Sequence, residues 1–151
     1  MYSKEEAKQL REDFWEGFRR YTLPRKRSKK LSPKWIMDKT GINALSLRFS
    51  LENNNAMVGI DIESRSMDKR LELYERIEAV KKLLHESMGK ELIWELDYER
   101  ENEKSVSRVY TILHDVSIYE RESWGDIYKF FFKNMLNLEV FFEEYRDYLK
   151  G

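Results

Sequence analysis

A helical spacing of apolar residues opens the chain. Ser3 and Glu6 stand three positions apart, as in a capping box, where each side chain bonds the other residue's amide. An apolar stripe then recurs at helical spacing, formed by Leu10, Phe14, Phe18 and Tyr21 with Trp15 beside it. Because proline lacks an amide proton, the pattern predicts a helix that begins at Ser3 and ends at Pro24.

The segment after this helix has few apolar side chains. Residues 24–30 are mostly basic and cannot pack unless a partner neutralises them, so we expect a mobile loop. Ser32 is an N-cap candidate before Pro33, which would take the first helical position, and Trp35 follows. One or two helical turns are therefore expected before Gly41.

A strand pattern and a helical pattern then occur twice. Apolar residues alternate with polar ones over 45–51 and 58–62, and three asparagines between these runs suit a tight turn, which predicts a β-hairpin. Residues 66–89 show helical spacing through Leu84 and predict one helix that Gly89 caps. A second hairpin is predicted over 92–98 and 106–114.

A long aromatic stripe closes the chain. Ser123 precedes Asp126 by three positions, which predicts another capping box, and apolar side chains continue at helical spacing almost to the last residue. The predicted order is helix, hairpin, helix, hairpin, helix. Hairpins favour an antiparallel sheet, and amphipathic helices must bury their stripes on it. We therefore expect one α+β domain, residues 1–151, with the helices packed on one face of the sheet.

Composition narrows the class of protein. The 151 residues include no Cys, which excludes disulfide scaffolds, iron-sulfur clusters and thiol catalysis and fits a reducing compartment. The first ten residues carry four charges where a signal peptide needs an apolar stretch, and no apolar run approaches the roughly 20 residues of a membrane span. We expect a cytoplasmic protein with no membrane partner and no cofactor.

Charge is distributed unevenly although the 28 basic and 28 acidic residues cancel. No acidic residue lies between Glu16 and Asp38, whereas the segment 19–34 holds eight basic ones. Such a segment attracts phosphate, and aromatic rings beside it can stack bases. The candidate contacts for nucleic acid or another polyanion are Arg25, Lys26, Arg27, Lys29, Lys30, Tyr21 and Trp35. The alternatives are a solvated loop, a charge match with the chain's own acidic residues, or an acidic protein partner.

Paired carboxylates form the second candidate site. Asp61 and Glu63 share one predicted strand and Glu95 and Asp97 another, so each pair should lie on one face and could hold Mg²⁺ in a nuclease. The lysine that follows the acid in restriction nucleases is missing from both strands, and the favoured interpretation is a solvated sheet face. His85 and His114 lack metal-ligand spacing, and the scattered glycines form no phosphate-binding loop.

Several local motifs resemble a known family. They are Arg11-Glu12-Asp13-Phe14-Trp15, Lys39-Thr40-Gly41-Ile42, Leu84 to Gly89, Trp94-Glu95-Leu96, Ser107-Arg108-Val109-Tyr110 and Trp124. Nearly the whole chain resembles an uncharacterised bacterial family of domains of unknown function, common in Bacteroidetes. The resemblance implies a domain that occurs alone or at the C-terminus of longer proteins with nuclease-like or restriction-related N-terminal regions, and it implies no active site.

Three functions follow from these observations. The leading hypothesis is a non-enzymatic binding or accessory domain that contacts a polyanion through its basic segment, with weak sequence specificity. The second is a divalent-metal nuclease, or a relic of one, that uses the four strand carboxylates. The third is a homo-oligomeric scaffold, because the consecutive rings of residues 130–132 cannot all point one way from a helix and one should meet a partner element or a second subunit.

Overall fold

Helices and strands follow one another in the predicted order, except that two helices stand where one was predicted between the hairpins. A computed structural model describes residues 2–100 and 104–151. The helices are α1 (Lys4–Ser28), α2 (Met67–Glu78), α3 (Lys81–Met88) and α4 (Trp124–Lys150), with a 3-10 turn at Arg121–Ser123. The strands are β1 (Leu45–Glu52), β2 (Asn55–Ile62), β3 (Ile93–Glu99) and β4 (Ser105–His114).

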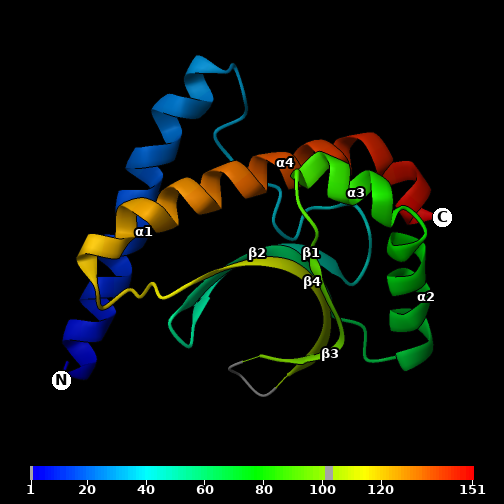
Figure 1. Cartoon of the computed structure of the whole chain (residues 1–151), viewed down its shortest axis with the longest axis horizontal. Coiled ribbons are helices and arrows are strands. Elements are labelled where there is room, and N and C mark those ends of the chain that lie inside the picture. Colours follow the sequence, from blue (N-terminus) through cyan, green and yellow to red (C-terminus); the bar gives the residue numbers. More distant parts are fainter. Residues whose placement is uncertain (1, 101–103) are drawn as a thin grey trace.

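The four strands form one antiparallel sheet in the order β1-β2-β4-β3. The two hairpins therefore lie side by side, with β2 and β4 in the centre. Helices α3 and α4 lie over one side of the sheet, α1 crosses one end of α4, and α2 stands near the other end (Figure 1). The predicted α+β class, the antiparallel sheet and the helical layer on one face are confirmed.

Side-chain alternation assigns each face of the sheet. Leu47 and Phe49 of β1 and Ile60 of β2 belong to the hydrophobic core beneath the helices. On the helical side, fully buried rings such as Phe14 of α1 and Phe131 of α4 fill the space between the layers. The period of two in the strands and the period near 3.6 in the helices thus direct apolar residues to one shared core.

The sheet curls strongly, so that its second face is concave (Figure 1). Gly59 in β2 lies against β4 so closely that a Cβ there would come within 2.6 Å of the Cβ of Tyr110. Between Glu95 and Tyr98 the pairing of β3 with β4 shifts register, which is the mark of a β-bulge and increases local twist. Because of the curl, β2 is buried along almost its whole length on both faces.

The first helix does not end at Pro24 as predicted. Helix α1 continues through Pro24 to Ser28, so most of the expected mobile loop is helical. The physical reason is tertiary packing, because Thr22 and Lys26 continue the buried row of Leu10, Phe14 and Phe18 at intervals of four residues. The predicted turn of helix after Ser32 is also wrong, since this segment adopts no helix before Gly41.

The second predicted helix is two helices. It breaks between Glu78 and Lys81, where Val80 leaves the helical region with φ −112° and ψ 23°. Helix α3 then runs in a different direction from α2 (Figure 1). Gly89 caps α3 with φ 71°, as predicted. The continuous apolar stripe concealed the break because Ile77 and Leu84 both face the same core.

The cap predicted for the last helix is also wrong. Ser123 does not cap the amide of Asp126 with its side chain. Its hydroxyl donates to the carbonyl oxygen atoms of Ser117 and Glu120, at 3.0 and 2.7 Å. The 3-10 turn that precedes α4 places this hydroxyl against the segment that contains Ser117 and Glu120. The hydroxyl therefore stabilises the segment that leads into the helix and not the first turn of the helix.

The three consecutive phenylalanines of α4 meet elements of the same chain. Phe131 packs among the rings of α1 and β1, and Phe132 contacts Tyr21 and Trp35. Phe130 is partly buried against the core, with the ammonium of Lys90 5.6 Å from its ring centroid. These contacts within one chain accommodate all three rings.

Candidate functional site

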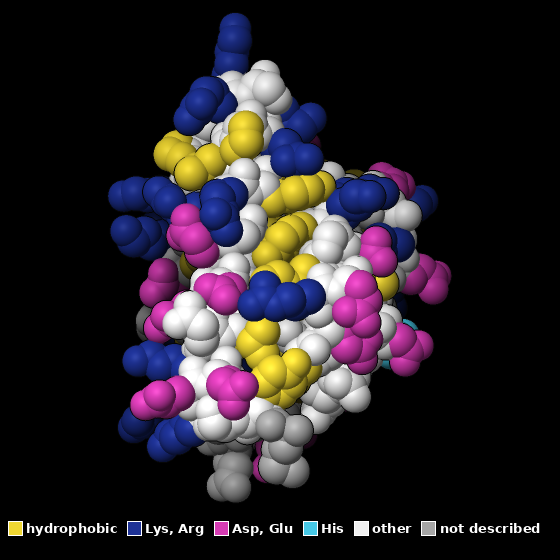
Figure 2. Space-filling view, turned by 90° about the vertical axis from the view of Figure 1, so that its left-hand side faces the viewer, with side chains coloured by type: hydrophobic (Ala, Val, Ile, Leu, Met, Phe, Trp, Pro, Cys, Tyr) yellow, Lys and Arg dark blue, Asp and Glu magenta, His cyan; other side chains and the backbone are white. Residues whose placement is uncertain are grey.

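The basic segment forms the end of α1 and the turn behind it. Seven of its eight cations are exposed, and we call the five that lie from Arg25 onward the basic tip: Arg25, Arg27, Lys29, Lys30 and Lys34. Figure 2 shows Lys and Arg side chains gathered at the upper end of one face of the molecule, where the last turns of α1 lie in Figure 1. The helix continues past Pro24 and therefore holds the first two of these cations on a rigid element.

Lys26 does not belong to this exposed set, and its assignment as a surface contact is wrong. Only 1% of the residue is exposed. Its ammonium lies 3.3 Å from the ring centroid of Trp35 and donates to the carbonyl oxygen of Lys34 at 3.4 Å. Burial lowers the pKa of Lys26, and the negative charge of Glu139 opposes that shift. Lys26 thus attaches the segment around Trp35 to the helix.

The two aromatic residues beside the basic tip are covered by the protein itself. The guanidinium carbon of Arg25 lies 3.6 Å from the ring centroid of Tyr21. Trp35 carries Lys26 and also stacks on Phe18, with centroids 6.3 Å apart and ring planes at 6°. Tyr21 and Trp35 therefore serve as partners for the chain's own cations and rings, and in each of them a cation occupies one face of the ring.

The cations of the basic tip are not engaged in salt bridges with the carboxylates that the structure describes. Counting residues 2–100 and 104–151, none of the five side chains forms a salt bridge. On the same helix, Arg19 does reach Glu16 at 3.7 Å. The predicted alternative, a charge match between the segment and the acidic body, is therefore absent at these five positions.

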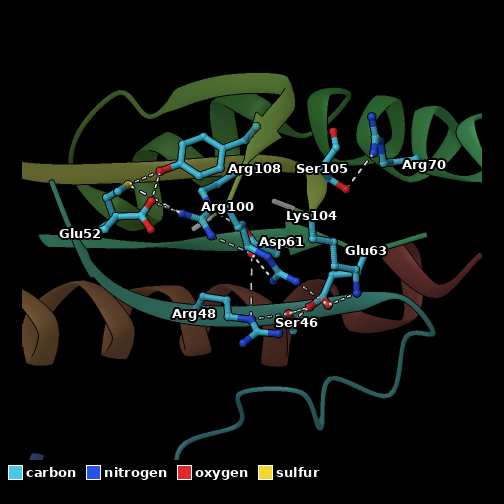
Figure 3. Close-up of polar contacts among 12 residues, drawn as sticks. Ser46, Arg48, Glu52, Asp61, Glu63, Arg70, Arg100, Lys104, Ser105 and Arg108 are labelled. Atoms are coloured by element: carbon cyan, nitrogen blue, oxygen red, sulfur yellow. Dashed lines mark hydrogen bonds and ion pairs between the residues drawn. The ribbon is translucent and has the colours of Figure 1, made fainter. Parts of the chain in front are cut away.

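The first carboxylate pair lies on the concave face of the sheet, in a cluster of arginines (Figure 3). Asp61 is fully buried, and each of its oxygens accepts a hydrogen bond from Arg108, at 2.7 and 2.9 Å. Arg100 donates to the same carboxylate at 3.1 Å. The expectation of a solvated strand face is wrong for Asp61, because the curl of the sheet encloses the concave side.

Glu63 shares this cluster at its rim. It accepts hydrogen bonds from Ser46 at 2.7 Å and Arg48 at 2.8 Å, and from Arg100 at 3.4 Å. Burial by itself would raise the pKa of Glu63, but the bonds from Arg48 and Ser46 and the charge of the arginines lower it to about 2. Asp61 and Glu63 do lie together, as predicted, and guanidinium groups occupy their oxygens.

The second carboxylate pair is divided by the β-bulge. Glu95 accepts a hydrogen bond from the hydroxyl of Tyr110 at 2.6 Å. Asp97 instead pairs with Arg70 of α2. The prediction that these two acids share a face is wrong, because the extra residue of the bulge inverts the alternation between them. In the described part of the chain, no three His, Asp or Glu side chains are grouped so that they could hold a metal ion.

Sequence reasoning missed the arginines that neutralise Asp61. Arg48, Arg100 and Arg108 come from three different segments, and the strand register places Arg108 directly opposite Asp61. A buried ion pair needs a counter-charge, so the signal that could have revealed the cluster was Arg108 within a predicted strand. The two histidines lie apart. His85 accepts from the amide of Leu92 and the indole of Trp94, both at 3.2 Å, and His114 pairs with Asn55.

These features define an α+β domain with an enclosed charge cluster in its sheet and an open basic tip on its first helix. The chain belongs to a family described as a domain of unknown function, DUF4268, whose model matches residues 10–146. Searches of curated proteins and of solved structures give no significant match. Among the described residues, no helix is long and apolar enough to span a membrane.

Proposed function

We propose that this chain is a non-enzymatic accessory domain that binds the phosphate backbone of nucleic acid through its basic tip. The observation that carries the proposal is the set of five exposed cations that have no salt bridge to any described residue. Each phosphate that such cations neutralise releases condensed counterions, so binding should weaken steeply as salt rises.

The geometry also favours weak sequence specificity. Three of the five cations are lysines, which act as mobile point charges, and phosphate contacts position a nucleic acid without reading its bases. The rings of Tyr21 and Trp35 are already occupied by Arg25 and Lys26, so the tip itself offers charge without stacking. A general affinity for phosphate backbones is the expected property of this surface.

The test is fluorescence anisotropy of labelled oligonucleotides at about 50 and 200 mM salt, a range over which phosphate contacts change affinity strongly. In the test variant, all five residues of the basic tip are replaced by Gln. We expect tight, salt-sensitive binding by the unmodified chain and a flatter salt dependence in the variant, by about 0.7 to 0.9 in log-log slope for each lost phosphate contact.

Two controls make this test specific. The first replaces five exposed cations away from the tip by Gln, namely Arg65, Lys69, Lys82, Lys133 and Lys150, and so gives the same net charge. The second is Lys26→Met, which should leave the slope unchanged because the ammonium is buried over Trp35. Equal losses of affinity in the tip variant and the first control, or no binding by the unmodified chain, would refute the proposal.

Magnesium-dependent cleavage of the oligonucleotide that Asp61→Asn abolishes would instead support an enzyme.

A further inference from the structure

A hollow of about 330 Å³ lies beside the middle of α1, between the β1–β2 turn and the segment before the 3-10 turn. This volume is at the lower end of the range for small-molecule sites. The walls combine one exposed indole, exposed amides and a guanidinium group, from Trp15, Asn53, Asn54 and Arg11. None of these residues takes part in the basic tip or in the charge cluster of the sheet.

Trp15 has a fixed and partly open ring. It stacks on Phe131 with centroids 5.9 Å apart and ring planes at 7°, and Phe14 meets it edge to face at 5.0 Å. The residue is nevertheless 39% exposed. Since Trp15 is one of the residues that line the hollow, this exposed surface is available to a planar group that enters it. A rigid, half-open aromatic ring is the usual platform for an unpaired base.

The turn opposite Trp15 supplies hydrogen-bonding groups. Asn53 and Asn54 have positive φ angles of 52° and 60°, and the carbonyl oxygen of Asn54 accepts a hydrogen bond from Val116 at 3.1 Å. The turn is therefore fixed in place. Both side-chain amides are exposed and bond to no residue that the structure describes. An amide offers a donor and an acceptor together, the combination that recognises the edge of a base.

The charges of the hollow suit a phosphate nearby. Arg11, one helical turn before Trp15, is exposed and forms no salt bridge within residues 2–100 and 104–151. The one carboxylate in the wall is that of Glu52, which accepts a hydrogen bond from the hydroxyl of Tyr98 and lies 3.9 Å from Arg108. Tyr98 and Arg108 thus compensate the negative charge of Glu52.

The hollow and the basic tip are connected along α1. Five residues follow one another at intervals of four, a rise of about 6 Å for each step: Arg11, Trp15, Arg19, Leu23 and Arg27. This row runs beside the buried row of the helix and ends within the basic tip. On the face of the molecule that Figure 2 draws, an apolar band lies below the upper end that is rich in Lys and Arg.

We propose that the hollow is a nucleobase site, in which a base of single-stranded nucleic acid stacks on Trp15 and is bonded by the amides of Asn53 and Asn54. This inference rests on the proposed function and extends it, since the backbone of the same strand would follow the row from Arg11 to the basic tip. A base inside a duplex cannot reach the indole face, so the site requires an unpaired strand.

The test compares two single strands of equal length in the anisotropy assay, one of thymidine nucleotides and one that lacks bases. Both strands carry the same phosphates, so their affinities differ only through contacts to the bases. We expect the thymidine strand to bind about 5- to 150-fold more tightly, the range for one base that stacks on an aromatic side chain. Trp15→Leu should remove this difference and leave the salt dependence intact, whereas Trp15→Phe should keep part of it.

A second variant protects the test against misfolding of the first. Replacing Asn53 and Asn54 by Gly removes both amides and preserves the positive φ angles of the turn. This variant should reduce the preference for the strand with bases, again without a change in salt dependence. Equal affinity of the unmodified chain for both strands, with a salt dependence that the basic tip controls, would overturn the base site and leave the proposed function standing. Binding of neither strand would overturn both.

Discussion

Buried charge in this protein is concentrated at Asp61, where the surrounding guanidinium groups replace the water that the carboxylate loses. Arg108 donates to both of its oxygens, and the guanidinium carbon of Arg108 lies 4.1 Å from the ring centroid of Tyr98. Removing one member of such a buried pair leaves an uncompensated charge, which commonly costs about 3–5 kcal/mol. This pair thus fixes the register of β2 against β4. The carboxylate of Asp61 is therefore engaged in a structural contact.

Glu63 should make the stability of the fold depend on acidity. Its pKa is near 2 in the folded chain and 4.5 as a free side chain, so its contribution is complete above pH 4.5 and is lost as the pH falls toward 2. Glu63→Gln should lower the free energy of unfolding at pH 7 by roughly 1–3 kcal/mol, and the difference from the unmodified chain should shrink toward pH 3.

Denaturant titrations at several pH values measure this effect. Glu144→Gln, at an exposed position on α4, is the matched control and should change stability by less than about 0.5 kcal/mol. A Glu63→Gln variant whose deficit is the same at pH 7 and pH 3 would show that the ion pairs of Glu63 contribute nothing to folding.

At the scale of the elements, close approach between strands shapes the concave face. Gly59 allows β4 to lie close against β2, because any Cβ there would overlap the backbone of Val109. The bulge in β3 then directs Asp97 away from the face that holds Glu95. Both devices are local, and together they convert a flat hairpin pair into an enclosed surface.

Gly59→Ala should therefore destabilise the protein by about 1–3 kcal/mol, the usual cost of an extra methyl group in a packed interior. Gly125→Ala is the control, because the position lies in the first turn of α4 with open space around it, and there we expect a neutral or slightly stabilising change. Thermal unfolding of the two variants measures the contrast. Equal melting temperatures would mean that the strands separate at Gly59 without cost.

At the scale of the whole molecule, α4 holds the layers together. It contacts α1, α2, α3 and the two central strands β2 and β4. Its buried rings join the aromatic cluster around Phe14 to the region of Leu149 near the other end. Since every layer packs on this one helix, we predict that residues 1–151 unfold as a single cooperative domain.

Coincident transitions would support this prediction. Far-ultraviolet circular dichroism follows all helices, and tryptophan fluorescence follows both ends of the molecule, through Trp15 on α1 and Trp94 on β3 beside α3. Denaturant midpoints from the two probes should agree. Two separate midpoints would indicate independent units and would contradict the single domain predicted from the sequence.

The amino-acid sequence by itself determined the elements that depend on local periodicity. Alternation identified β1, β2 and β3, the run after the polar stretch identified β4, and the helical stripes identified α1 and α4, because burial of one face imposes these periods wherever an element forms. The concentration of positive charge near the end of α1 was also visible. Features that depend on residues close together in sequence, including the positive φ angle at Gly89, were largely predictable.

Only the tertiary structure decided which charges stay exposed and which acids lie together. Lys26 is buried because Trp35, from the segment that follows α1, and Glu139, from α4, approach it, and α1 passes through Pro24 because its buried row continues beyond it. Asp61 is enclosed by arginines that share no pattern along the chain. Pairing across strands and packing between layers depend on register and curl, and these arise from contacts between residues far apart in sequence.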